Sequence, residues 1–147
     1  GIDTAYVTMH TGLGSFREID VEDLTKHKMD SDLISVDTEA VQLINKAKTE
    51  NRRICAVGTS VQRVLETAAL TGGMLKEYDG WTSKFIFPEY NFQVANCMIA
   101  NFYAPYSTML MLTTAFGGYN NVMNAYKVAL DEGYRFGLYG DAMLIID

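Results

Sequence analysis

The alternation of apolar and polar positions predicts the strands of this chain. In residues 5–10, Ala5, Val7 and Met9 fall on one side and the residues between them on the other, which is typical of a half-buried strand. Further short apolar runs predict strands at residues 53–57, 85–87 and 94–101, and terminal strand material at 134–139 and 143–146.

Apolar residues at helical spacing predict the helices. They run from Asp37 or Thr38 to Asn51, from Ser60 to about residue 70, over 107–116 and over about 120–132. Ser60 is the expected N-cap of the second helix, and Gly133 is expected to end the last one.

Strands that alternate with helices in this way imply an α/β fold with a mixed, largely parallel sheet. The charged residues 16–36 are interpreted as a loop with one helical turn, and the segment around Gly80-Trp81-Thr82 as another loop. In such folds ligands bind where the carboxyl ends of the strands meet. Polar clusters after the predicted strands therefore indicate one composite site, with parts near His10, Gly58, Asn101 and Asp141.

Composition limits these possibilities only moderately. A length of 147 residues with 48% hydrophobic and 20% charged residues suits one globular core. A formal net charge of −6 argues against an extended basic surface, so a nucleic acid would need a local patch or another part of the protein. Since the chain begins with Gly1 at the approach to a strand, we expect it to be a piece of a longer polypeptide.

The cysteines and the apolar runs indicate a reducing compartment and no membrane segment. Cys55 and Cys97 lie in apolar runs without metal-ligand spacing, and we expect both to be unpaired core residues. The longest apolar runs are far shorter than the roughly 20 residues that cross a bilayer.

Two segments in the first quarter carry candidate chemistry. His10-Thr11-Gly12-Leu13-Gly14 places an imidazole and two glycines after a strand, although a tight turn explains the same pattern equally well. His27-Lys28-Met29-Asp30-Ser31-Asp32 combines a base, a cation and two carboxylates, and a solvated charged loop is the simpler interpretation.

Later candidates also have plain structural alternatives. The predicted helix after Gly58 could bind an anion through Thr59 and Ser60, but capping, with a surface ion pair between Arg63 and Glu66, fits as well.

Trp81, next to Thr82, could stack on a base or fill the core, and the core is favoured. Asn101 at a strand end and Asp141 in a glycine turn are better candidates than the many tyrosines. Common hydrolase, metalloprotease and NTPase motifs are missing from the sequence.

Six motifs in order carry a family resemblance. They are Val7-Thr8-Met9-His10-Thr11-Gly12-Leu13-Gly14-Ser15-Phe16, His27-Lys28-Met29, Ala56-Val57-Gly58-Thr59 with Arg63 and Leu65-Glu66, Gly80-Trp81-Thr82 with Phe85-Ile86 and Pro88, Asn101-Phe102 with Pro105 and Ser107-Thr108, and Tyr134-Arg135-Phe136 with Tyr139-Gly140-Asp141-Ala142-Met143. Together they resemble the C-terminal part of the S-adenosylmethionine:tRNA ribosyltransferase-isomerase family.

The resemblance implies a step of queuosine biosynthesis. The ribosyl part of S-adenosylmethionine moves to 7-aminomethyl-7-deazaguanine in a tRNA anticodon loop, which gives epoxyqueuosine, adenine and methionine. It implies S-adenosylmethionine as co-substrate, tRNA as partner, no metal, no membrane and a cytoplasmic location. It also implies that residues 1–147 form the C-terminal segment of an α/β barrel-like catalytic domain, without the N-terminal strands and an inserted β-barrel domain.

The same resemblance suggests roles for the motif residues. His10 and His27 are the expected bases, and Asp30, with Asp32 or Asp141 as alternatives, is expected to neutralise the sulfonium or the methionine ammonium. Thr59 and Ser60 would bind the methionine carboxylate or ribose hydroxyls, and Arg63 an anionic group. The remaining expected substrate-binding residues are Gly12, Gly14, Glu66, Trp81, Thr82, Asn101, Tyr103 and Asp141.

The chain departs from the family pattern at several positions, of which Tyr103 matters most. A histidine usually stands there, so altered activity is an open alternative, in the form of a non-catalytic small-molecule or RNA-binding module. A third possibility is a domain that only completes or dimerises a barrel. Missing barrel strands would expose sheet edges, so self-association is expected.

Overall fold

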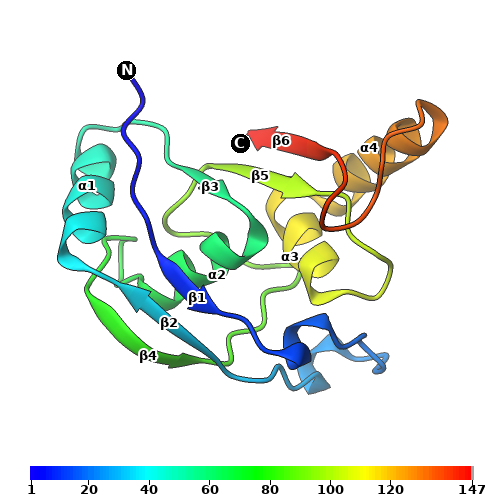
Figure 1. Cartoon of the computed structure of the whole chain (residues 1–147), viewed down its shortest axis with the longest axis horizontal. Coiled ribbons are helices and arrows are strands. Elements are labelled where there is room, and N and C mark those ends of the chain that lie inside the picture. Colours follow the sequence, from blue (N-terminus) through cyan, green and yellow to red (C-terminus); the bar gives the residue numbers. More distant parts are fainter. Residues whose placement is uncertain (147) are drawn as a thin grey trace.

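The computed structural model describes residues 1–146, so residue 147 of the predicted segment lies outside them. Two three-stranded sheets and four α-helices make up the fold (Figure 1). The strands are β1 (Thr8–His10), β2 (Asp32–Val36), β3 (Cys55–Val57), β4 (Tyr78–Thr82), β5 (Cys97–Asn101) and β6 (Ala142–Ile146). The helices are α1 (Thr38–Thr49), α2 (Thr59–Ala68), α3 (Thr108–Gly117) and α4 (Tyr119–Asp131), with short 3-10 helices η1 (Leu13–Phe16) and η2 (Leu24–Lys26).

Most strand pairs are antiparallel, so the predicted largely parallel sheet is wrong. The first sheet has the order β1-β2-β4 with antiparallel neighbours. In the second sheet, of order β3-β5-β6, β3 runs parallel to β5 and β6 runs antiparallel to it. The α/β class is confirmed, but the two sheets are separate and do not close into a barrel.

β2 and β4 lie in segments that the sequence predicts to be loops, and both belong to the antiparallel first sheet. β2 begins with the charged Asp32 and β4 contains Gly80 and the exposed Trp81, which hid the strand pattern. Conversely, residues 85–87 and 134–139 form no strand. The predicted strand at 5–10 is confirmed in its last three residues, with the predicted alternation of burial.

Local signals explain the helix boundaries. Asp37 caps α1 by accepting the amide hydrogen of Ala40 at 2.8 Å, and the Ser107 hydroxyl accepts that of Leu110 at 3.1 Å at the start of α3. Gly58, with a φ of 100°, forms the N-cap of α2, so the predicted cap at Ser60 is wrong. A backbone turn by glycine replaces side-chain capping at this end.

The core lies where α2 packs against strands of both sheets. Ile34 of β2, Val64 of α2 and Met98 of β5 are fully buried there. Each such apolar side chain contributes about 1.5–3 kcal/mol by leaving water. Cys97 is buried as predicted, whereas its in-register neighbour Cys55 is exposed, so that half of the cysteine prediction is wrong.

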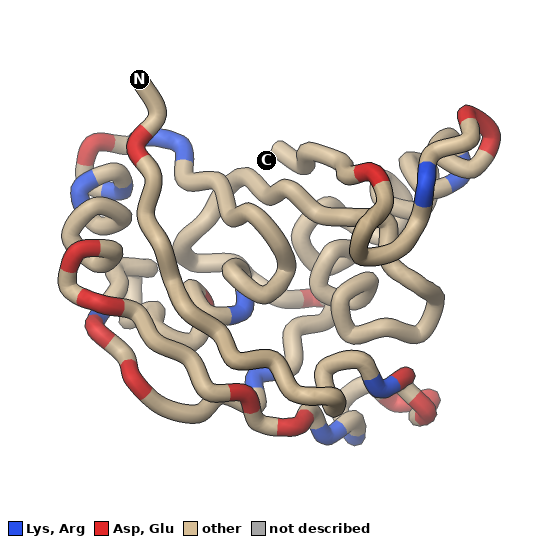
Figure 2. Tube along the Cα trace, viewed as in Figure 1, with Lys and Arg blue, Asp and Glu red and all other residues tan. Residues whose placement is uncertain are grey.

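Charge is spread rather than concentrated on this fold. Figure 2 shows Lys and Arg scattered among Asp and Glu along the chain, without one continuous basic stretch. Within residues 1–146, no helix is both long enough and apolar enough to cross a membrane.

Candidate functional site

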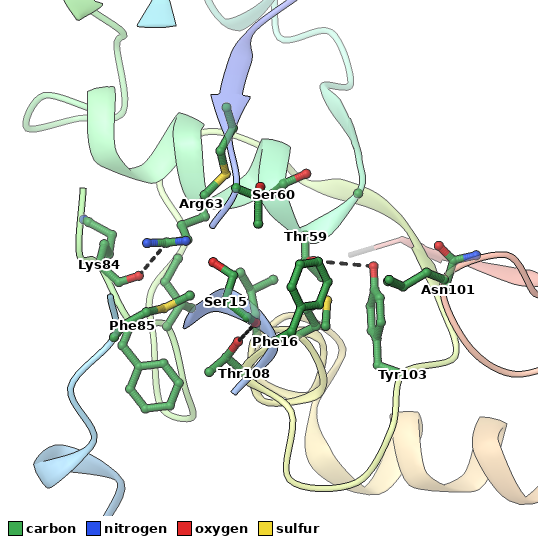
Figure 3. A pocket seen from close by; sticks show the side chains of 18 residues that line it. Ser15, Phe16, Thr59, Ser60, Arg63, Lys84, Phe85, Asn101, Tyr103 and Thr108 are labelled. Atoms are coloured by element: carbon green, nitrogen blue, oxygen red, sulfur yellow. Dashed lines mark hydrogen bonds between the residues drawn. The ribbon is translucent and has the colours of Figure 1, made fainter. Parts of the chain in front are cut away.

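A cavity of about 280 Å³ lies among β1, η1, α2, the end of β5 and α3 (Figure 3). Its lining is mixed, with thioether and aromatic side chains beside hydroxyl, amide and cationic ones. The lining residues are Met9, Thr11, Ser15, Phe16, Met29, Gly58, Thr59, Ser60, Arg63, Lys84, Phe85, Ile86, Asn101, Tyr103, Thr108, Met109, Leu112 and Leu138. Segments far apart in the sequence therefore line one cavity, and they include the predicted parts at Gly58 and Asn101 but not His10 or Asp141.

The N-terminus of α2 opens into this cavity. Gly58, Thr59 and Ser60 all line it, and the first amides of a helix are free to bind an anion or a polar ligand atom. Thr59 is buried, and its hydroxyl donates to the Tyr103 hydroxyl at 3.4 Å, as the dashed line in Figure 3 shows. The sequence placed Thr59, Ser60 and Tyr103 in one site, and the structure brings them together.

Arg63 lies one turn further along α2, with its guanidinium committed to the protein. Its Nη1 donates to Asp32 Oδ2 at 2.5 Å, its Nη2 to the carbonyl of Thr82 at 3.0 Å, and its Nε to the carbonyl of Lys84 at 2.9 Å. The predicted surface ion pair between Arg63 and Glu66 is wrong, because both side chains are buried and have other partners.

Asp32 accepts hydrogen bonds from Arg63 and from two residues of the segment before it, and it lies behind the cavity lining. Only 1% of it is exposed, and its Oδ1 accepts the Gly12 amide hydrogen at 2.8 Å while Oδ2 accepts the Ser15 hydroxyl at 2.7 Å. Burial alone would raise the pKa of Asp32, but the hydrogen bonds from Gly12, Ser15 and Arg63, and the charge of Arg63, outweigh it. The pKa of Asp32 therefore lies below its ordinary value.

This lowered pKa predicts a pH dependence of stability. The folded pKa lies below the ordinary value of 3.8, so ionised Asp32 stabilises the fold above that pH, and the contribution is lost as the pH falls through the folded pKa. We expect Asp32→Asn to flatten the decline of the free energy of unfolding below about pH 4 in urea titrations. An Asp32→Asn protein with the wild-type acid slope would contradict this origin of the pH dependence.

Lys84 is a lining residue that the sequence did not single out. Its Nζ donates to the Glu66 carbonyl at 2.7 Å and to the Tyr90 hydroxyl at 3.3 Å, and Tyr90 donates to Glu66 Oε2 at 3.0 Å. Glu66 Oε1 also accepts the amide hydrogens of Gln93 and Val94, at 2.9 and 3.1 Å. Glu66 does not line the cavity. Its carboxylate holds the segment of Gln93 and Val94, which lies behind the cavity lining.

His10 does not line this cavity, although its neighbours Met9 and Thr11 do. In the strand register it lies opposite Leu33, which lies opposite Trp81, so these three occupy one row on the first sheet. Both His10 and Trp81 are exposed, and alternation along β1 places His10 on the face away from Met9. The favoured core position of Trp81 is therefore wrong, whereas Thr82 beside it is buried.

His27 and Asp30 lie near the cavity without lining it. The His27 ring is half-buried, with its centroid 4.7 Å from that of the lining Phe85. Asp30 is exposed and pairs with Arg17 at 3.5 Å. A Cβ at Gly14 would overlap the Asp30 side chain, so this glycine permits the close approach of the two segments.

Asn101 and Tyr103 lie on the side of the cavity opposite Arg63 and Lys84 (Figure 3). Asn101 donates to the carbonyls of Gly140 and Asp141 at 3.3 and 3.1 Å, which ties the end of β5 to the last turn. The Asp141 carboxylate accepts the amide hydrogen of Arg135 at 2.7 Å and does not line the cavity. The amide of Tyr103 donates to the Tyr126 hydroxyl at 2.8 Å. Burial raises the pKa of Tyr126 to about 12; the hydrogen bond from the Tyr103 amide lowers it and the charge of the Tyr103 side chain raises it.

The apolar lining residues and Ser15 are not among the site residues that the sequence predicts. The alternation of residues 5–10 already placed Met9 on the buried side, and this signal could have identified it. Met29 and Phe85 stand in the motifs that carry the family resemblance, whereas Met109 has no such signal, because only the fold brings it to the cavity. No group of three or more His, Cys, Asp or Glu side chains within residues 1–146 is placed to hold a metal ion.

Comparison with known proteins identifies the family of this chain. A family model described as queuosine biosynthesis protein matches residues 1–145. The chain belongs to the queuosine biosynthesis protein family.

The relatives of this queuosine biosynthesis family member include curated proteins named S-adenosylmethionine:tRNA ribosyltransferase-isomerase. Those of Phocaeicola vulgatus and Bacteroides fragilis are 65% and 63% identical over 147 residues, which are 100% of this chain and 42% of each relative. That of Cytophaga hutchinsonii is 50% identical over 146 residues, 99% of this chain and 42% of the relative. The chain thus spans about two fifths of the length of the curated relatives it matches.

A solved structure supports the same relationship. The crystal structure of S-adenosylmethionine tRNA ribosyltransferase from Thermotoga maritima matches 78% of this chain and 41% of its own, with a TM-score of 0.71 and 38% sequence identity. The family resemblance inferred from the six motifs is confirmed.

Proposed function

We propose that this chain is part of an S-adenosylmethionine:tRNA ribosyltransferase-isomerase, which moves the ribosyl moiety of S-adenosylmethionine onto 7-aminomethyl-7-deazaguanine in the tRNA anticodon loop. Adenine and methionine are released and epoxyqueuosine is formed. The observation that carries the proposal is the cavity, because most of its walls come from the motifs that gave the resemblance. The names of relatives at 50–65% identity support the same activity.

The lining suits a ligand with both apolar and polar parts. Met9, Met29 and Met109, with Phe16 and Phe85, offer a polarisable surface that keeps water away from a reactive sulfonium. The α2 N-terminus, through Thr59 and Ser60, offers donors for the methionine carboxylate or ribose hydroxyls. The absence of a metal stays a prediction.

The assignment of His10 and His27 as bases stays a prediction. A base must remove a proton next to the sulfonium, and the lining described above contains no imidazole. His27 packs on the lining Phe85, whereas His10 lies on the outer side of the first sheet. His27 is therefore the better placed of the two.

Adenine release from S-adenosylmethionine tests the function. We expect the full-length protein to release adenine only with tRNA that carries the 7-deazaguanine precursor, as measured by chromatography. His27→Ala should lower turnover by about 100-fold or more if His27 is the base. Losses within a few-fold in both His10→Ala and His27→Ala would remove both bases from the mechanism.

Absence of release by the folded full-length protein would favour the non-catalytic binding module and make Tyr103 the first residue to change. The cytoplasmic location, the anticodon-loop contact and self-association also stay predictions. Exposed Leu144 and Ile146 on β6, which pairs on one side only among the described strands, support self-association.

A further inference from the structure

Both cationic side chains that line the cavity point their charge at acidic residues behind its wall. Arg63 and Lys84 are these cations, and neither Asp32 nor Glu66 lines the cavity itself. Figure 3 shows the guanidinium of Arg63 beside the backbone of Lys84, to which it is bonded. Both positive charges are therefore bonded to protein groups behind the lining rather than left free in the cavity.

Asp32 neutralises Arg63 directly. The two side chains are 5% and 1% exposed and meet at 2.5 Å, so solvent screens the pair little. The same carboxylate holds Gly12 and Ser15, of which Ser15 lines the cavity. One residue thus fixes the position of the η1 segment and cancels a charge next to the cavity.

Lys84 is held in a comparable way through a phenol. Its ammonium donates to the Tyr90 hydroxyl, which in turn donates to the Glu66 carboxylate. The ammonium also donates to the Glu66 carbonyl. The second cation of the lining is therefore also directed toward a buried carboxylate.

We propose that Asp32 is a positioning residue that cancels the charge of Arg63, so that the cavity accepts a ligand carrying a positive sulfonium. This inference rests on the proposed function, which supplies S-adenosylmethionine as the ligand. Without Asp32, the Arg63 guanidinium keeps its charge and repels a cationic ligand at short range. A neutral ligand of the same shape feels no such repulsion.

Asp32→Asn separates this electrostatic role from a structural one, because it removes the charge with little change of shape. The probes are S-adenosylmethionine, which has a sulfonium, and S-adenosylhomocysteine, which has a neutral thioether in its place. We expect Asp32→Asn in the full-length protein to weaken S-adenosylmethionine binding by about tenfold more than S-adenosylhomocysteine binding, as measured by calorimetric titration.

Asn45→Asp is the matched control. Asn45 of α1 also ties two segments, with its side chain bonded to both the amide and the carbonyl of Leu75, and it lies outside the cavity lining. This isosteric change should leave the ratio of the two affinities at the wild-type value. If Asp32→Asn leaves the ratio of the two affinities at the wild-type value, the charge-cancelling role is wrong.

The double variant Asp32→Asn with Arg63→Gln removes both charges and keeps the test decisive if the single variant does not fold. The proposal requires its affinity ratio to return to the wild-type value, and a ratio shifted against the sulfonium would refute it. If the wild-type protein binds neither ligand, the proposed function fails instead. Hydrogen exchange at the Gly12 amide then decides the positioning role, which requires faster exchange in Asp32→Ala, where the acceptor is lost, but not in Asn45→Ala.

Discussion

Replacing Arg63 with methionine is expected to lower the free energy of unfolding by about 3–5 kcal/mol, the usual cost of leaving one partner of a buried ion pair alone. Asp32 would remain as a buried carboxylate without its cation, since only 1% of it is exposed. The carbonyls of Thr82 and Lys84 would lose their donors at the same time. Urea unfolding at neutral pH measures this loss.

Arg17→Met is the matched control for this change. Arg17 pairs with Asp30 at 3.5 Å, but the two side chains are 70% and 52% exposed, so about 0–1 kcal/mol is expected. Similar losses in the two variants would show that the buried pair contributes no more than a surface pair. The difference between them therefore measures the effect of burial.

The starts of α1 and α3 and the end of α4 were predictable because their signals are local. Asp37 and Ser107 accept hydrogen bonds within one turn of their own positions, and Gly133 stops the last helix wherever the rest of the chain lies. A cap needs only a few neighbouring residues. The sequence contains all of them.

The strands β2 and β4 were not predictable in the same way, because tertiary contacts satisfy their polar residues. Asp32 suggests a loop until Gly12, Ser15 and Arg63 surround its carboxylate, and these partners are 17 to 31 residues away. Trp81 suggests a core residue, but the register places it on the exposed row with His10. Long-range pairing decided both cases.

The candidate site was predictable as a set of segments but not as a set of side chains. The segments at Ser15, Thr59 and Asn101 converge as the polar clusters indicated. Which neighbour faces the cavity depends on a single step along a strand, as Met9 and His10 show. Arg63 and Glu66 looked like surface residues, although each holds backbone groups of a distant segment.

Replacing Glu66 with alanine is the second change expected to have a large effect. Glu66 is 3% exposed, and its Oε1 accepts two backbone amide hydrogens, those of Gln93 and Val94. Each buried donor left without a partner costs about 1–3 kcal/mol, so the two together predict a loss of about 2–6 kcal/mol in the free energy of unfolding.

The segment that Glu66 holds connects the cavity wall to the second sheet. Val94 is buried just before β5, and Lys84 of the cavity lining is bonded to the Glu66 carbonyl and to Tyr90. Glu66→Gln keeps an oxygen for both amides and should cost about 1 kcal/mol, the scale of one exchanged hydrogen bond. Urea unfolding of both variants gives the comparison. An equal loss in the alanine and glutamine variants would mean that the negative charge, rather than the two amide hydrogen bonds, stabilises this region, because both variants remove the charge and only alanine removes the acceptor.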